Sequence, residues 1–308
     1  MADNSLTETF LTYFEREAPA FAKHVRETAA RQPVWFHELS EPMLGWARQV
    51  IGDGWCETLA NGYMAFLIDV NRSQDEYERD LHYRFSSYDE VFAQTYDDPE
   101  FMADYHWGVY ITTFAWEHHL HIYDFFLRHF IAPLRDSGAH GRLIDLGCGS
   151  GIWSSLTLRH LENWNSTMVD ISATTIDLTR RTLKCAGLSS RTDLREADAL
   201  RFREETTFDA GVSCFLLEHL ETPKKLLDNL AAALRQRALA FVTTALTAAE
   251  IDHIFEFRRE SEVIDMVEKA GFRVVASFSS APHTVKPGAA FLPRSMALVL
   301  QKRAGDYW

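Results

Sequence analysis

The second half of the chain alternates between short apolar runs and helical segments, and this alternation constrains the fold most strongly. Such a pattern is typical of a mostly parallel, doubly wound α/β sheet with helices on both faces. The last two runs have no helix between them, so we expect an antiparallel pairing there. The predicted strands are Leu143–Ile144, Thr167–Val169, Thr192–Glu196, Phe208–Cys214, Ala238–Thr244, Phe272–Phe278 and Met296–Gln301.

The first half has apolar residues at helical spacing and no alternating strand pattern. We therefore predict two domains: residues 1–138 as a helical lid or substrate-binding domain, and residues 139–308 as the α/β domain. The lid is expected to hold a first helix with Phe10 and Phe21, a second after Pro33, a third with Leu59 and Leu67, short elements over residues 71–104, and a long helix over residues 107–132 that stops near Pro133.

A glycine-rich loop follows the first predicted strand and reads Asp145-Leu146-Gly147-Cys148-Gly149-Ser150-Gly151. Ligands of doubly wound sheets bind at the carboxyl ends of the strands, and glycine lets the backbone turn tightly and approach a ligand closely. The spacing is G-x-G-x-G, which differs from the G-x-G-x-x-G of dinucleotide sites. A nucleotide-dependent dehydrogenase is therefore disfavoured.

Carboxylates stand at the ends of successive predicted strands. Asp145 would repel a pyrophosphate but would favour the sulfonium and ammonium groups of S-adenosylmethionine (SAM). Asp170 ends the second strand, where its two oxygens can accept both hydroxyl protons of a ribose. Asp198 follows the third strand and can accept from an adenine amino group. The fourth strand runs into Phe215 and then Leu216-Leu217-Glu218-His219-Leu220.

These motifs resemble class I SAM-dependent methyltransferases over about residues 140–303. The resemblance implies a seven-stranded sheet with an antiparallel last strand, SAM as cofactor and a small-molecule type of enzyme with an N-terminal helical lid. One departure is Arg235-Gln236-Arg237, where relatives often have a Pro-Gly-Gly turn. The cofactor-binding residues that it implies are Asp145, Gly147, Cys148, Gly149, Gly151, Asp170, Ile171, Asp198, Ala199 and Phe215.

The acceptor and the catalytic residues are not specified by the cofactor motifs. On the predicted long helix, Glu117 and His121 are four residues apart and share a face, so we predict them as catalytic residues. His253 follows the fifth strand and is a third catalytic candidate. A metal site or a purely structural role for the helix cluster stays open, and we assign no metal ligand. The predicted substrate residues are Tyr105, Trp107, Tyr110, His118 and Glu256.

Charge is distributed unevenly along the chain. Residues 1–140 contain 23 Asp and Glu against 10 Lys and Arg, whereas residues 141–308 contain 21 of each. An acidic first half argues against nucleic acid as a partner and allows a cationic amine or guanidine acceptor. A 2-oxo acid or an aromatic natural-product scaffold fits about as well, and the alternative interpretation is that the acidic surface serves solubility alone.

The remaining expectations concern location and assembly. The polar N-terminus lacks a signal-peptide pattern and no apolar run is long enough to span a membrane, so a cytoplasmic protein without membrane contact is expected. The four scattered cysteines predict free thiols and no redox role for Cys148. A homodimer through the lid is a further possibility. The main alternative function is a protein that binds SAM without transferring its methyl group.

Overall fold

The computed structural model describes residues 5–138, 140–204, 207–282 and 291–304. Seven strands form a single sheet in the order β3-β2-β1-β4-β5-β7-β6. Strands β1 to β5 pair in parallel, and β7 pairs antiparallel with both β5 and β6. The predicted doubly wound sheet with an antiparallel last strand is therefore confirmed. The strands are β1 (Gly141–Leu146), β2 (Trp164–Asp170), β3 (Thr192–Glu196), β4 (Phe208–Cys214), β5 (Leu234–Leu246), β6 (Phe272–Ser280) and β7 (Arg294–Lys302).

Helices cover both faces of the sheet because successive residues of a buried strand point to opposite sides. Leu143 and Phe241 face one core, whereas Ile144 and Val242 face the other. The helices of the second half are α9 (Ile152–His160), α10 (Ala173–Cys185), α11 (Pro223–Ala233) and α12 (Glu260–Lys269), with short 3-10 turns η2 (Ser189–Arg191) and η3 (Leu217–His219). Helices α9 and α10 pack on the first face, and α11 and α12 on the second.

The N-terminal half is helical, as predicted, but its boundaries differ from the prediction. The helices are α1 (Leu6–Glu17), α2 (Pro19–Arg31), α3 (Pro33–Ile51), α4 (Trp55–Asp80), α5 (Tyr88–Gln94), α6 (Pro99–Ala115), α7 (Glu117–Phe126), the π-helical turn η1 (Leu127–Ile131) and α8 (Ala132–Asp136).

Three expected helices were wrong in extent. The predicted first helix is two helices, because Ala18 precedes Pro19 and has a non-helical conformation. Helix α4 continues to Asp80, through residues expected to form short elements. The predicted long helix is interrupted at Trp116, which adopts an extended conformation, and the chain stays helical past Pro133.

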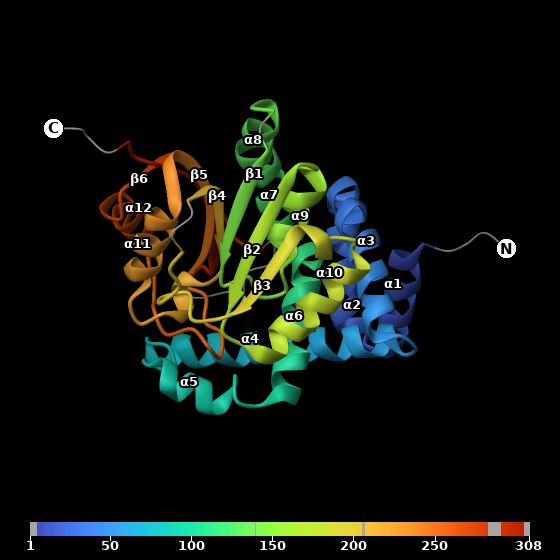
Figure 1. The fold of residues 1–308 in the computed structure, drawn as a ribbon. Helices are drawn as coiled ribbons and strands as arrows, with labels where there is room; N and C mark the ends of the chain where they lie inside the picture. The colour runs from blue at the N-terminus through green and yellow to red at the C-terminus, as the bar shows by residue number, and fades with distance from the viewer. Residues whose placement is uncertain (1–4, 139, 205–206, 283–290, 305–308) are drawn as a thin grey trace.

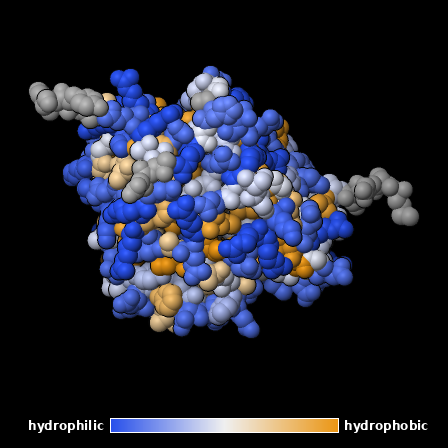
Figure 2. All heavy atoms as spheres, in the orientation of Figure 1, coloured by the Kyte–Doolittle hydropathy of each residue, from blue (hydrophilic) through white to orange (hydrophobic). Residues whose placement is uncertain are grey.

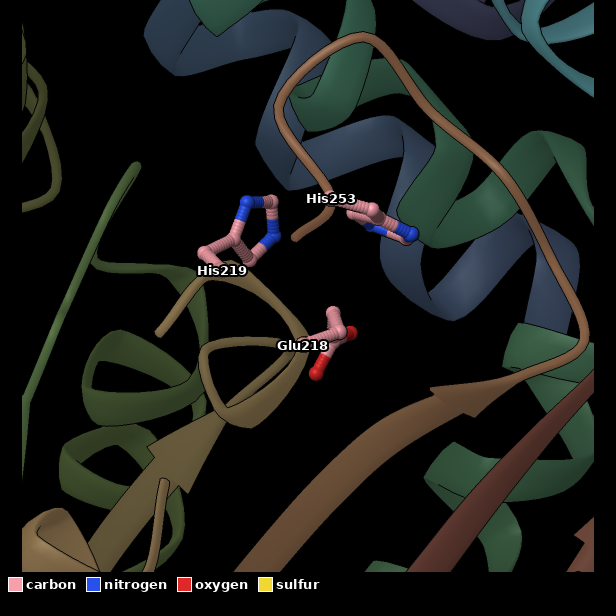
Figure 3. Close-up of side chains that lie close together, drawn as sticks. All are labelled: Glu218, His219 and His253. Carbon is pink, nitrogen blue, oxygen red and sulfur yellow. The ribbon is translucent and has the colours of Figure 1, made fainter. Parts of the chain in front are cut away.

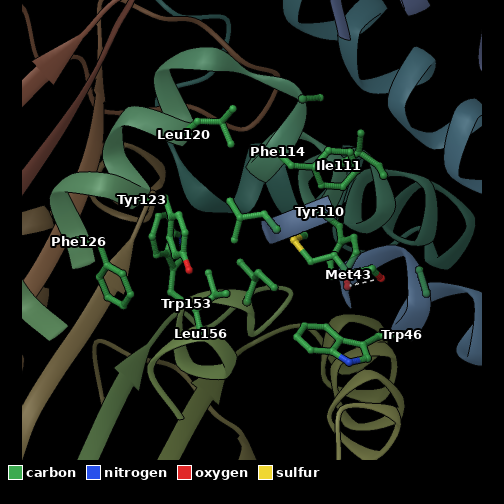
Figure 4. Close-up of a cluster of buried hydrophobic side chains, with 14 of the residues drawn as sticks. Met43, Trp46, Tyr110, Ile111, Phe114, Leu120, Tyr123, Phe126, Trp153 and Leu156 are labelled. Carbon is green, nitrogen blue, oxygen red and sulfur yellow. Dashed lines mark hydrogen bonds between the residues drawn. The ribbon is translucent and has the colours of Figure 1, made fainter. Parts of the chain in front are cut away.

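The helical half and the sheet share one continuous apolar core. Tyr123 and Phe126 of α7 lie beside Trp153 of α9, and Phe126 also contacts Phe241 of β5 (Figure 4). The last helices of the predicted lid therefore pack against one face of the sheet. Its division from the α/β domain at residues 138 and 139 stays an interpretation, and residue 139 lies outside the described residues.

Helices α4 and α5 cross the edge at which the parallel strands end (Figure 1). Figure 2 shows apolar residues in a band between this edge and the two helices, on a face that is otherwise mostly hydrophilic. Within the described ranges, no helix combines the length and apolar character needed to cross a membrane. All four cysteines are free thiols.

Candidate active site

A cavity of about 880 Å³ lies between the carboxyl ends of the strands and the N-terminal helices. Its walls come from the loops after β1, β2, β4 and β5 and from helices α4, α6 and α7. In a doubly wound sheet, the loops after the first and fourth strands diverge to opposite faces, and this divergence opens a crevice. The fold therefore brings the predicted motifs to one hollow.

The glycine loop is shaped by its neighbours. Gly147 has φ +73°, and a Cβ there would collide with the side chain of Leu216. The amides of Gly147 and Cys148 donate to the carbonyl of Val169 at 2.8 and 2.9 Å, which holds the loop against the end of β2. Gly149 also has a positive φ, of +49°, and a Cβ there would meet open space. The loop can thus present bare backbone to the cavity.

Asp170 joins the second strand to the glycine loop. Its Oδ2 accepts the amide of Gly149 at 2.8 Å, and its Oδ1 accepts the amide of Ser172 at 3.0 Å. Burial raises the pKa of this carboxyl, while those backbone donors oppose the shift. A carboxylate oxygen has two lone pairs, so each oxygen of Asp170 retains acceptor capacity toward the cavity that it lines.

Asp145 is a buried acid at the end of β1, only 2% exposed. Its Oδ2 accepts a hydrogen bond from the Ser154 hydroxyl at 2.7 Å. Burial, together with the negative charge of Asp170, raises the pKa of Asp145 to about 7 despite that bond. A cation in the cavity would favour its ionised form.

The other predicted cofactor residues also line the cavity, with one exception. They are Cys148, Ile171, Asp198, Ala199 and Phe215. Asp198 accepts the amide of Leu200 at 2.8 Å, and Phe215 has a left-handed φ of +51° that is held by a hydrogen bond to Thr243. Gly151 does not line the cavity; its φ is +68°, and a Cβ there would collide with Met168 and Thr179. A glycine at position 151 therefore allows the close packing of this turn against β2 and α10.

A family model described as a methyltransferase domain matches residues 144–240, which contain the glycine loop, Asp170, Asp198 and the β4–β5 pair. The chain carries a class I SAM-dependent methyltransferase domain. SAM is accordingly the cofactor of this methyltransferase, and the seven-stranded sheet has the arrangement that the family implies. The sequence of the methyltransferase matches no curated protein.

Solved structures resemble this methyltransferase in fold. An O-methyltransferase family protein from Burkholderia thailandensis superposes with a TM-score of 0.55 at 14% identity, covering 81% of this chain and 72% of its own. A putative sarcosine dimethylglycine methyltransferase from Galdieria sulphuraria gives a TM-score of 0.45 at 12% identity, covering 56% and 82%. The N-methyltransferase NodS from Bradyrhizobium japonicum gives 0.46 at 14% identity, covering 60% and 88%.

The structure divides the predicted substrate and catalytic residues into two groups. Tyr105, Glu117, His118 and His253 line the cavity. Glu117 is also ion-paired with Arg31 at 2.8 Å, so it does not face the cavity as an isolated charge.

The second group lies outside the cavity wall, and its predicted roles stay predictions. Trp107 and Tyr110 are buried among the N-terminal helices, and the Tyr110 hydroxyl donates to the carbonyl of Met43 at 2.9 Å. His121 pairs with Gln32 at 2.9 Å between the ring and amide nitrogens. Glu256 accepts from the Tyr77 hydroxyl and is ion-paired with Arg258. Of the two residues on the predicted shared face of the helix, Glu117 therefore reaches the cavity and His121 does not.

Sequence reasoning missed a cluster of ionisable side chains at the ends of β4 and β5. His219 Nδ1 lies 3.2 Å from Asp252 Oδ2, and the two imidazole rings of His219 and His253 are 4.7 Å apart and perpendicular (Figure 3). The neighbouring carboxylates raise the pKa of His219 to about 10, against the opposing effect of burial. Burial beside Asp252 raises the pKa of Glu250 to about 8.

The turn after α5 and the 3-10 turn η3 complete this cluster. The Tyr96 hydroxyl donates to Asp252 Oδ2 at 3.1 Å, and Glu218 is fully buried, with its carboxylate bonded to Thr244 and to the amide of Ala245. A signal was present in the sequence, since Glu218-His219 follows one strand and Asp252-His253 follows the next. Only the pairing of β4 with β5 brings these two short runs together.

Proposed function

We propose that this methyltransferase transfers a methyl group to the amine of a small, partly apolar acceptor. The observation that carries the proposal is the charge of the cavity wall. Among the described residues, ten carboxylates line the cavity, and the only Lys or Arg there is Arg294. Arg294 is itself ion-paired with Glu260 at 2.8 Å.

This charge balance separates the acceptors that the sequence left open. An anionic 2-oxo acid would meet repulsion from the wall, whose only Lys or Arg among the described residues already has a carboxylate partner. An ammonium or guanidinium group would be attracted into the cavity. Aromatic side chains such as Tyr105 and Trp116 add faces on which a cation or an apolar body can rest.

The cofactor residues fit SAM in their chemistry. Asp170 can accept from ribose hydroxyls, Asp198 and Ala199 can flank adenine, and Gly147 to Gly149 can hold the methionyl end against backbone. When bound, SAM supplies an electrophilic methyl group on a sulfonium. The acceptor nitrogen releases its proton to water or to a wall carboxylate and attacks the methyl group as the neutral amine. The protein contributes by orienting that nitrogen in line with the methyl group and by excluding water.

The test is release of S-adenosylhomocysteine with matched acceptors. Purified protein is incubated with SAM and with an aryl-alkyl amine, its neutral alcohol isostere, a phenol and a 2-oxo acid. We expect release with the amine and little with the oxo acid. Preference for the oxo acid or the phenol would contradict the proposal, and SAM binding without release from any of them would count against methyl transfer to these classes.

Two variants make this test more specific. Glu78→Gln and Glu221→Gln each remove one wall carboxylate outside the proposed cofactor residues. Both should raise KM for the amine several-fold and leave KM for SAM unchanged. Asp177→Asn, on the exposed surface of α10, is the matched control and should leave both constants unchanged.

A further inference from the structure

The end of the cavity beneath β4 and β5 gathers side chains of the types that bind transition metals. Glu218, His219 and His253 each offer a ligand atom, and these atoms all lie within 4.8 Å of one another (Figure 3). Glu250, Asp252 and His253 form a second group with the same spacing. The two groups share His253, so the five residues form one pocket of nitrogen and oxygen donors.

Each of the two histidines has one ring nitrogen close to an oxygen acceptor, as metal-binding histidines do. His253 Nδ1 lies 2.8 Å from the carbonyl of Ala248 and must carry the proton there. Its Nε2 is then the lone-pair nitrogen, and it lies 3.7 Å from Glu250 Oε2. The Nδ1 of His219 lies beside Asp252 Oδ2, which is the carboxylate–histidine arrangement found behind metal ligands.

Hydrogen bonds hold Glu218 in place, and the described residues give Glu250 and Asp252 no Lys or Arg partner. Glu218 is fixed by the Thr244 hydroxyl at 2.7 Å and the Ala245 amide at 3.1 Å. In the described part of the chain, the ion-pair partners of Glu250 and Asp252 are histidines and not Lys or Arg. Asp252 is 2% exposed, yet its Oδ1 accepts no hydrogen bond from any described residue. A buried carboxylate oxygen without a partner is costly unless a cation or water satisfies it.

We propose that Glu218, His219 and His253 bind one divalent transition-metal ion at this end of the cavity, with Asp252 and the Ala248 carbonyl orienting the two imidazoles. Two imidazoles and a carboxylate suit Zn²⁺, Fe²⁺ or Co²⁺ better than Mg²⁺ or Ca²⁺, which prefer oxygen donors alone. The ion would lie in the wall of the methyltransferase cavity and would hold the loop after β4 to the loop after β5. This proposal does not depend on the class of acceptor.

The test uses Co²⁺ as a spectroscopic probe, because its visible absorption reports the number and kind of its ligands. Full-length protein without a histidine tag is stripped with a chelator and titrated with Co²⁺ alone. We expect one equivalent to bind with a visible d–d spectrum, and Zn²⁺ to displace it. Titration without a saturating spectrum at one equivalent would overturn the proposal.

Variants locate the site. His253→Gln and His219→Gln should each weaken Co²⁺ binding at least 100-fold, whereas His129→Gln, an exposed histidine of η1, should bind like the wild type. Equal Co²⁺ affinity in His253→Gln and His129→Gln would overturn the assignment. SAM binding, measured by calorimetry on the same samples, should persist in all variants. Retained SAM binding shows that each variant is folded. It also distinguishes failure of the metal-site proposal from failure of the proposed methyl transfer.

Discussion

The carboxylate of Asp170 accepts the backbone amide of Gly149 at 2.8 Å, so one hydrogen bond joins the end of β2 to the glycine loop after β1. The proposed ribose ligand is therefore also a structural partner of the loop proposed to hold the methionyl end. Any change at Asp170 is expected to act on both parts of the cofactor site.

Replacing Asp170 tests this double role. Asp170→Ala should weaken SAM binding by about 2–4 kcal/mol, because charge-assisted hydrogen bonds to the ribose are lost. It should also lower Tm, since the amides of Gly149 and Ser172 lose their acceptor. Asp170→Asn should keep more of the stability and still lose affinity. Calorimetry and thermal unfolding check both effects, and unchanged SAM affinity would exclude the ribose role.

The pH dependence of SAM binding should report Asp145. Its pKa is raised to about 7 by burial, and a bound cation favours the carboxylate. SAM affinity should therefore rise with pH up to about 7, by at most about tenfold per pH unit. Asp145→Asn cannot titrate and should bind SAM more weakly without this dependence. Parallel pH profiles of the wild type and Asp145→Asn, measured by calorimetry, would contradict the prediction.

The same group should affect the stability of the SAM-free protein. A folded-state pKa above the ordinary value of 3.8 means that the folded state binds the extra proton between about pH 4 and 7. Stability is then lost as pH rises through that range, by up to about 4 kcal/mol. Asp145→Asn should lack this loss and be the more stable protein at pH 8. Urea unfolding at several pH values measures the difference; a wild type more stable than the variant at pH 8 would refute it.

Gly147→Ala should disable the cofactor site by displacing the backbone of the glycine loop. Gly147 has φ +73°, and a Cβ there would collide with Leu216. The strain and the clash should together cost about 2 kcal/mol of stability. Displacement of the loop should also abolish measurable SAM binding. Gly187→Ala, which has a similar φ of +72° and open space around the Cβ, isolates the conformational cost. Equal effects of the two substitutions on SAM binding would rule out the steric explanation.

Tyr110→Phe tests whether Tyr110, a predicted substrate residue that does not line the cavity, has a structural role instead. The hydroxyl donates to the carbonyl of Met43 in a fully buried setting, so its loss should cost about 1–2 kcal/mol. KM for the acceptor should not change, because Tyr110 does not line the cavity.

His121→Ala should leave SAM binding intact and change turnover by less than about twofold. Steady-state kinetics and chemical denaturation distinguish these structural roles from a catalytic one.

Much of the cofactor site could be predicted because it is local in sequence. A strand that ends in Asp145 must place the following glycines at the sheet edge, and Asp170 reaches the same edge from the next strand. The strand predictions were close for similar reasons, since apolar runs between turn residues have few alternatives. The helix interruptions at Ala18 and Trp116 were missed. A proline follows the first, but the second has no strong breaker in the sequence.

The sequence by itself determined the order of strands and helices, the glycine loop and its acids, and the acidic character of the first half. Tertiary structure decided which helical side chains reach the cavity: it buries Tyr110 in the core and brings His118 to the wall. It also decided that His219 meets Asp252 and His253. Periodicity specifies a face of one element, whereas contact between distant residues depends on how β4 and β5 pair and how α4 to α7 pack over their ends.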